Sequence, residues 1–461
     1  MVTRNRLVPI IVASPLFLQN IDTSAIATAL PSIAESLQVP PLHVNLAITS
    51  YLLSLAVFLP LSGWLADRFG AKRVFCLAIA FFSLGSALCG AATSLPELVI
   101  FRVLQGLGGA MMLPVGRLIL LRAVPSSQMV SAMVWYTVPP IMGRMMGPLF
   151  GGVIVTLTSW RWIFFINIPL GLLAIFLALK FVDDSDGTEV PAPFDTKGFL
   201  LLALGLCALM GTLESVGKSL VPIWASGLLA GLGLLALLLY YLHGRRQAHP
   251  IIDLSILSFR TYRTNVVGGM PLRIAVGAAP FLLPLMLQLG FGLSPLTSAL
   301  LTVATSIGGL STRLVMKRAI LSIGFRNLLV GATTLTGLFY ISYSQFSPST
   351  PHLLMFCTLM MGGLVNSLSM VALATLGFSE IPKPRMSHAT TLASMIQQLS
   401  VSFGVVLGAT SVSVAAWWYG GDPAHLQARD FSPAFVVVGL LTMLSLYSFL
   451  QLHPKEGAEM Q

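Results

Sequence analysis

The sequence predicts an all-α membrane protein with about 14 transmembrane helices, arranged as two pseudo-symmetric six-helix bundles plus an inserted two-helix hairpin. Its composition is the first reason. Of 461 residues, 56% are hydrophobic and 9% are charged, and the mean hydropathy is +0.87. Soluble domains carry about 25% charged residues. The chain therefore lacks the polar atoms that an aqueous surface needs, which excludes a water-soluble enzyme.

The second reason is a series of fourteen apolar runs, most of them near the roughly 20 residues that a helix needs to cross a bilayer. Arg4 and Arg6 precede the first run, as in a signal peptide. That run is too long, however, lacks a small-residue cleavage site and continues past Asp22. We therefore expect a first helix that is retained. The runs cover about 7–30, 44–66, 74–93, 98–120, 130–156, 163–181, 198–216, 222–242, 265–289, 295–311, 327–346, 351–376, 388–416 and 431–451.

Lysine and arginine indicate the orientation of these helices, because cytoplasmic loops are enriched in both. With a cytoplasmic N-terminus, the inner segments hold 20 of the 26 Lys and Arg residues, and three lie at membrane depth. The outer loops hold Arg161, Lys218 and Arg429. This bias predicts an even number of spans in a bacterial-type inner membrane, with both termini cytoplasmic. The net charge of +10 then belongs to inner loops, so no nucleic-acid partner is expected.

The polar segments divide the chain into four parts. Residues 1–181 are expected to form the N-terminal six-helix bundle, and 182–263 the linker and the inserted hairpin. Residues 264–451 are expected to form the C-terminal six-helix bundle, and 452–461 a cytoplasmic tail. Two related halves around a central site are a common plan among transporters.

No grouping typical of catalysis or cofactor binding is found in the sequence. It has no nucleotide-binding Gly-rich loop, no cluster with metal-ligand spacing and no CxxC pair. The four cysteines, all in apolar runs, are Cys76, Cys89, Cys207 and Cys357. We therefore expect no enzyme and no cofactor, and an ion gradient or the substrate gradient as the source of energy.

A polar loop follows the second apolar run. In this loop Gly63 is expected to let helices approach closely, Gly70 to make a tight turn, and Asp67 to pair with basic residues or a helix N-terminus. Arg68 and Lys72 supply the basic charge. An inner loop with a glycine turn explains the composition about equally well.

The spacing of this loop resembles the signature loop of the major facilitator superfamily. A weaker copy, Arg318 followed by Gly324-Phe325-Arg326, lies at the equivalent place in the second half, as an internal repeat requires. Three more segments carry the resemblance: Asp22 to Pro31 in helix one, Arg102-x-x-Gln105-Gly106 in helix four, and Gly143, Gly147-Pro148 and Gly151-Gly152 in helix five.

Together these segments resemble the fourteen-helix drug:proton antiporter branch of that superfamily. The resemblance covers essentially the whole chain and is most specific over residues 20–170. It implies export of hydrophobic or amphipathic compounds, driven by inward proton flow. Three positions depart from the family pattern: Tyr136 replaces a glycine, Ala71 replaces a basic residue, and Arg144 stands where a small or apolar residue is usual.

Ionisable residues at membrane depth are rare and usually functional. Asp22 is expected about 12 Å below the outer end of helix one and Arg102 about 6 Å below the same surface, so the two side chains can meet. Burial favours the neutral acid and a neighbouring arginine favours the carboxylate, which suits a proton-coupling pair. The alternatives are a static ion pair and an Arg102 that extends to the outer surface.

The glycines of helix five recur at spacings of four and predict a smooth face for close helix packing, while Pro148 bends the helix. The family resemblance implies that this face also seals the pathway between the halves. Similar small-residue faces are expected at Gly106 with Gly109, and at Gly404 with Gly408.

Four residues are candidates for substrate binding: Arg144, Arg273, Tyr136 and Gln288. The two arginines are expected to face one cavity from opposite bundles. Guanidinium groups bind carboxylates and phosphates, so the substrate is expected to be anionic or zwitterionic. Alternatively, Arg144 bonds helix carbonyls or impairs the antiporter motif.

The sequence thus predicts a proton-coupled exporter of amphipathic small molecules that works by alternating access and needs no cofactor. The bilayer and the substrate are its expected partners, and a monomer is the expected state. The alternatives are an importer or facilitator of organic anions, or a membrane ligand sensor that does not transport.

Overall fold

The computed structural model describes residues 2–124, 129–183, 193–215, 222–247, 250–382, 385–421 and 426–453. Within these ranges every regular element is a helix. Fourteen helical segments there are long and apolar enough to cross a membrane. The predicted fold class and number of spans are therefore confirmed. Lys218 and the tail residues 454–461 lie outside the described ranges.

The chain forms two compact units. Unit 1 contains residues 1–39, 46–212 and 227–251, and unit 2 contains residues 40–45, 213–226 and 252–461. Most of the predicted hairpin therefore belongs to unit 1. The division into two bundles and a separate hairpin stays a prediction.

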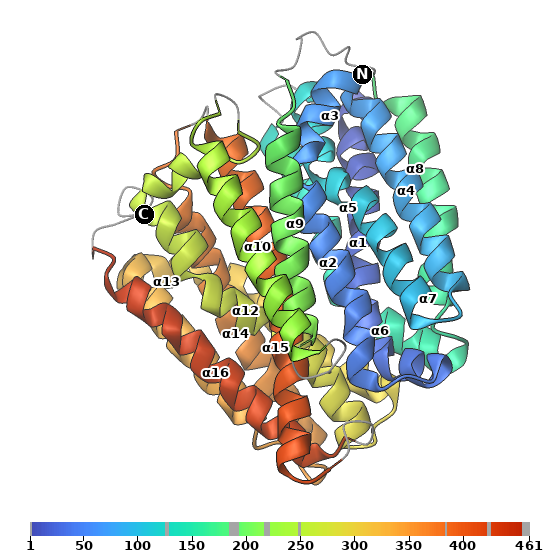
Figure 1. The fold of residues 1–461 in the computed structure, drawn as a ribbon, viewed down its shortest axis with the longest axis vertical. Coiled ribbons are helices and arrows are strands. Elements are labelled where there is room, and N and C mark those ends of the chain that lie inside the picture. Colours follow the sequence, from blue (N-terminus) through green and yellow to red (C-terminus); the bar gives the residue numbers. More distant parts are fainter. Residues whose placement is uncertain are drawn as a thin grey trace. The chain divides into compact units, whose positions relative to one another are not determined.

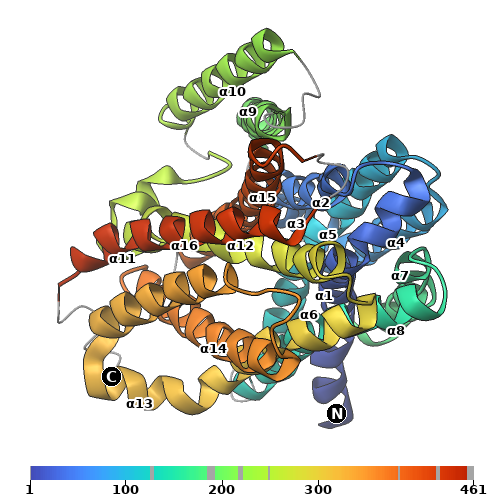
Figure 2. The ribbon, with the colours of Figure 1, turned by 90° about the horizontal axis from the view of Figure 1, so that it is seen from below.

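Unit 1 is built around α1, which packs against α5, α6 and α8 (Figures 1 and 2). The helices that lie wholly or mostly in unit 1 are α1 Val2–Leu37, α2 Asn45–Phe58, α3 Leu61–Phe69, α4 Ala71–Ala91, α5 Leu95–Ala123, α6 Met129–Leu157, α7 Trp162–Phe165, α8 Asn167–Phe181, α9 Thr196–Ser215 and α10 Ile223–Gly244.

Local chemistry sets the ends of these helices. α5 begins at a cap in which the Ser94 hydroxyl accepts a hydrogen bond from the Glu97 backbone N–H. The second apolar run is divided into α2 and α3 beside Pro60, because a proline cannot donate the next backbone bond. At the hairpin, Asp195 accepts from the Gly198 N–H at the start of α9, and its carboxylate lies 2.7 Å from His243 near the end of α10.

α1 continues to Leu37 and α5 begins at Leu95, so both helices are longer than their apolar runs. Asp22 is therefore about 22 Å from the end of α1 and Arg102 about 10 Å from the start of α5. These distances to the helix ends exceed those to the ends of the apolar runs, and the depths of about 12 and 6 Å below the membrane surface stay predictions. The distance for Asp22 is longer because α1 continues through Pro31 into a polar last turn.

Unit 2 consists of the elements η1 Pro41–Val44, η3 Leu254–Ser258, α11 Arg260–Arg263, η4 Thr264–Gly268, α12 Met270–Leu285, η5 Met286–Gly290, α13 Pro295–Tyr343, α14 His352–Gly377, α15 Met386–Trp418 and α16 Ala428–Leu450. η4 and η5 are π-helical turns. α13 contains two candidate spans, Pro295–Met316 and Arg318–Tyr343, and has a kink at Gly324, where φ is 76°.

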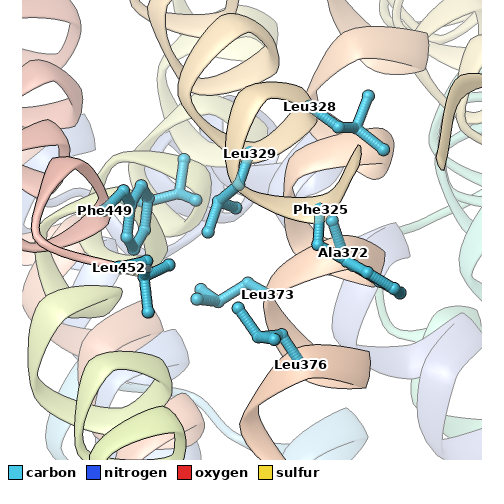
Figure 3. Close-up of a cluster of buried hydrophobic side chains, with 9 residues drawn as sticks. Phe325, Leu328, Leu329, Ala372, Leu373, Leu376, Phe449 and Leu452 are labelled. Carbon is cyan, nitrogen blue, oxygen red and sulfur yellow. The ribbon is translucent and has the colours of Figure 1, made fainter. Parts of the chain in front are cut away.

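The core of unit 2 includes a cluster of buried apolar side chains, most of them from α13, α14 and α16 (Figure 3). Phe325 of this cluster follows Gly324 directly. The next residue, Arg326, donates to the Leu450 carbonyl 2.9 Å away, and Arg260 donates to the Gln451 carbonyl. Cations at a helix C-terminus are favourable, so the end of α16 is held by two guanidinium groups.

Candidate functional site

Asp22 and Arg102 form a buried ion pair inside unit 1. Asp22 projects from the middle of α1 and Arg102 from the second turn of α5. Arg102 Nη1 lies 2.6 Å from Asp22 Oδ2, and the side chains are 1% and 0% exposed. The two predicted partners therefore meet. The alternative in which Arg102 extends to the outer surface is wrong.

Neutral polar groups complete the surroundings of Asp22. Its Oδ1 accepts from Gln105 Nε2 at 3.2 Å and from Asn167 Nδ2 at 3.1 Å. Both amides also donate to the Ser86 hydroxyl, at 3.0 and 2.8 Å. The network therefore joins four helices, α1, α4, α5 and α8, at a single carboxylate.

Aromatic rings enclose the arginine of the pair. The Arg102 guanidinium carbon lies 5.1 Å from the centre of the Tyr51 ring and 4.9 Å from that of Phe164. A cation over an aromatic face is attracted to it, and more strongly where water is excluded. The site therefore stabilises a charged Arg102 while keeping it out of water.

The glycine face of α6 packs against the backbone of α1. A Cβ added at Gly143 would lie 2.5 Å from the Phe17 carbonyl oxygen, and one at Gly151 would lie 2.5 Å from the Ala25 carbonyl oxygen. At Gly147 an added Cβ would overlap the Ser24 hydroxyl. The predicted packing face is confirmed, and the expected sealing of a pathway stays a prediction. Of the other two motif residues in α6, Pro148 is half-buried and Gly152 is buried.

Arg144 lies on α6 between the first two of these glycines. Its side chain is exposed, and Nη2 donates to Asn20 Oδ1 of α1 at 3.2 Å. Asn20 and Asp22 are two residues apart, which is about 200° around a helix. Arg144 and the Asp22 pair therefore lie on opposite sides of α1.

The remaining substrate candidates are buried. Arg273 is 4% exposed, and its guanidinium donates to the backbone carbonyl and the side-chain oxygen of Asn265. Tyr136 donates its hydroxyl to the Leu113 carbonyl at 2.7 Å. Gln288 lies in the π-helical turn η5. Of the four candidates, Arg144 is thus the exposed residue, and a role in substrate binding stays a prediction for all four.

The loop between α3 and α4 turns at Gly70, where φ is 88°, so the predicted tight turn is confirmed. The expected close approach at Gly63 is wrong: no described heavy atom lies within 4 Å of the place its Cβ would take, because the residue is on the exposed side of α3. Asp67 and Arg68 are exposed and Lys72 is half-buried.

The loop also makes a contact that the sequence does not reveal. The Arg68 guanidinium carbon lies 5.4 Å from the centre of the Trp64 ring. Trp64 packs on Phe194, which precedes α9, with ring centres 5.1 Å apart. The signature loop therefore touches the segment that leads into the hairpin.

Sequence reasoning missed Asn167 and Ser86 as site residues and did not assign Gln105 a role. The available signal was weak, since neutral polar residues are common in apolar runs. Asn167 is 145 positions from Asp22 along the chain. Only the fold brings these residues together.

The sequence profile of the Major Facilitator Superfamily matches residues 16–405. This chain belongs to the major facilitator superfamily. Its members are transporters, and the chain is a multi-pass membrane protein of that type.

Two relatives carry the name "Putative multidrug resistance protein MdtD". The one from Klebsiella pneumoniae is 37% identical over 443 residues, which cover 96% of this chain and 92% of that protein. The one from Pectobacterium atrosepticum is 38% identical over 447 residues, which cover 96% and 93%.

Solved structures show the same fold at low identity. A peptide transporter of the POT family matches with a TM-score of 0.71 at 13% identity, over 96% of both chains. A D-xylose–proton symporter matches with a TM-score of 0.67 at 15% identity, over 98% of both chains. At these identities the matches support the fold and nothing further.

Proposed function

We propose that this transporter is a proton-coupled exporter of hydrophobic or amphipathic small molecules, with Asp22 as the group that carries the coupled proton. The buried pair of Asp22 with Arg102, 2.6 Å apart, carries the proposal. A relationship to multidrug resistance proteins at 37–38% identity supports export of such compounds. The protein acts as a carrier by alternating access, with neither catalysis nor a cofactor.

The ion pair couples protonation to a change of conformation through the free energy of an uncompensated buried charge. While Asp22 is ionised, it neutralises Arg102 within an apolar interior. A proton on Asp22 removes that compensation, and an unpaired buried charge is strongly unfavourable. The protonated state therefore favours a rearrangement of α1, α5 and α8, whose side chains meet at Asp22. Release of the proton into the cytoplasm restores the pair.

Arg144 gives the proposal its substrate class. Arg144 is an exposed residue, and its guanidinium can bind a carboxylate or phosphate and repel a permanent cation. We therefore assign an anionic or zwitterionic amphipathic substrate. The excess of Lys and Arg in the inner segments supports an inner membrane location with both termini cytoplasmic. A monomer is sufficient, since both units belong to one chain.

The test is uphill transport by purified protein in proteoliposomes under an imposed proton gradient. Wild type is expected to accumulate a lipophilic anion against its gradient, and Asp22→Asn to lose this accumulation while its melting temperature shows that it remains folded. An Asp22→Asn protein that still accumulates substrate would exclude Asp22 as the coupling site. Transport of the anion without proton dependence would favour a facilitator, and binding without flux would favour a sensor.

A further inference from the structure

Protonation reverses the hydrogen-bonding needs of Asp22. A carboxylate accepts hydrogen bonds, whereas a carboxylic acid must also donate one. The three side chains that bond Asp22 all donate to it: Arg102 at 2.6 Å, Gln105 at 3.2 Å and Asn167 at 3.1 Å. This arrangement suits the ionised form. A buried donor without an acceptor costs about 1–3 kcal/mol, so the protonated form needs one partner to present an oxygen.

Gln105 cannot present one without a penalty. Its Oε1 accepts from Arg102 Nη1 at 2.6 Å while its Nε2 faces Asp22. Turning this amide would place its N–H groups against the guanidinium, which has only donors. The bond to Arg102 therefore fixes the orientation of Gln105.

Asn167 is not fixed in this way. Its Nδ2 donates to Asp22 and to Ser86, but its Oδ1 is buried and has no hydrogen-bond partner in the described part of the chain. The torsion of a terminal amide is broad and roughly two-fold. A half-turn would place Oδ1 where the acid proton of Asp22 and the hydroxyl of Ser86 can both donate to it.

We propose that Asn167 is a proton-responsive positioning residue: its amide donates to the ionised Asp22 and turns to accept from the protonated Asp22. No covalent bond changes, and the proton stays on Asp22. The turn gives the acid proton an acceptor and moves Nδ2 to the place that Oδ1 now occupies, so it favours the protonated state because the bond to the acid outweighs the loss at Nδ2. This inference rests on the proposed coupling role of Asp22.

The other titratable and charged groups that interact with Asp22 are Arg102 of α5, Tyr51 of α2 and Cys89 of α4. Arginine remains charged in proteins, and neither a phenol nor a thiol has a carboxylic-acid C=O group. The carboxylic-acid band that Asp22→Asn removes therefore reports on Asp22 itself. Asn167 reports through its amide, which does not titrate.

The test is infrared difference spectroscopy of the full-length protein, low pH minus high pH, with and without isotope-labelled asparagine. Wild type is expected to show a carboxylic-acid C=O band that is lost in Asp22→Asn. A labelled amide C=O band should change with the same pH midpoint. In Asn167→Leu, similar in size but without hydrogen bonds, that amide band should vanish, the acid band should move to higher frequency and the pH midpoint should shift.

A Ser86→Ala variant is the control, because it removes the acceptor that Asn167 and Gln105 share but leaves the three side chains that bond Asp22. It should keep the acid band near its wild-type frequency. The inference fails if no asparagine amide band changes with pH in wild type. It also fails if Asn167→Leu leaves the frequency and the pH midpoint of the acid band unchanged. If Asn167→Leu does not fold, the wild-type amide band alone tests the inference.

The two proposals can fail separately. If Asp22→Asn still drives uphill export while, in wild type, the acid and amide bands change with the same pH midpoint, the coupling role of Asp22 is wrong and the proposed turn of Asn167 stands. If Asp22→Asn abolishes export and no amide band responds, the coupling role stands and this inference is wrong.

Discussion

At the scale of single residues, Arg102 shows how a charge is kept inside a bilayer protein. Its side chain is 1% exposed, with a carboxylate oxygen at 2.6 Å, an amide oxygen at 2.6 Å and two aromatic rings about 5 Å away. Each group compensates for part of the lost hydration. The arrangement thus separates two properties that experiments can measure independently: stability, which needs balanced charges, and coupling, which needs a titratable acid.

We predict that Arg102→Ala lowers stability and abolishes export, since breaking a buried pair on one side costs about 3–5 kcal/mol. The double variant Asp22→Asn with Arg102→Gln removes both charges. It should melt at a higher temperature than Arg102→Ala in detergent, yet remain unable to export. A double variant that is less stable than Arg102→Ala would contradict this account of the pair.

Sequence reasoning reaches the pair but not its surroundings. A carboxylate and an arginine at membrane depth are rare enough to be selected by residue type, and their helical positions suggest that they can meet. Asn167 and Ser86 belong to a common residue class, and their part in the site depends on how α4 and α8 pack. Packing between distant segments is not encoded in local spacing.

At the scale of helices, the contact of α6 with α1 leaves no room for side chains. A Cβ added at Gly143 or Gly151 of α6 would lie 2.5 Å from a carbonyl oxygen of α1. Backbone atoms cannot move aside as a flexible side chain can. A methyl group there must therefore push the helices apart.

Gly151→Ala is accordingly expected to lower the melting temperature and the transport rate. Gly227→Ala on α10 is the matched control, because no described heavy atom lies within 4 Å of its added Cβ. That control should behave like wild type or slightly better, since alanine favours a helix over glycine. Equal losses in both variants would show that the α6 contact has no special importance.

The α6 glycines also show why the close approach expected at Gly63 is wrong. A glycine that permits a close contact and one that faces open space look identical in a sequence. Spacings of four, repeated across Gly143, Gly147 and Gly151, distinguish the first case, and Gly63 has no such series. Turn glycines are easier, since Gly70 and Gly324 both adopt the positive φ that the loop signature and its repeat require.

At the scale of the whole molecule, the exposed signature loop is expected to control the conformational cycle. We predict that Asp67→Asn slows transport and shifts the balance of inward- and outward-facing states, with little change in substrate affinity. Transport rates, binding constants and cysteine accessibility measure these three quantities. Glu35→Gln, an exposed acid on α1, is the matched control and should leave all three unchanged. A large loss of affinity with normal cycling would contradict the prediction.

The proposed substrate class is tested with lipophilic anions and cations of matched shape. Wild type should prefer the anion, and Arg144→Ala should reduce that preference roughly 10- to 150-fold, since a charge-assisted hydrogen bond contributes about 1.5–3 kcal/mol. Arg273→Ala should lose stability but keep the preference, because the guanidinium of Arg273 bonds Asn265 in its own segment. A wild type that prefers cations, unaffected by either change, would exclude an anion-selective site.

The overall architecture could be predicted from the sequence because it depends on the average composition of long segments. Twenty apolar residues suffice for a span wherever they occur, and the Lys and Arg bias sums over many loops. Helix ends are set by single residues and are less predictable. α1 therefore extends seven residues beyond the expected Leu30.

Helix α1 carries Asn20, which meets Arg144, on one side and Asp22 on the other. The helix body separates the two. Under the proposed function, substitutions beside Arg144 therefore change which compounds are recognised without altering the hydrogen bonds of the carboxylate. New specificities can then arise by single mutations while the energy source is inherited intact. For the exporter proposed here, such a layout allows a lineage to diversify rapidly when its host meets unfamiliar toxins.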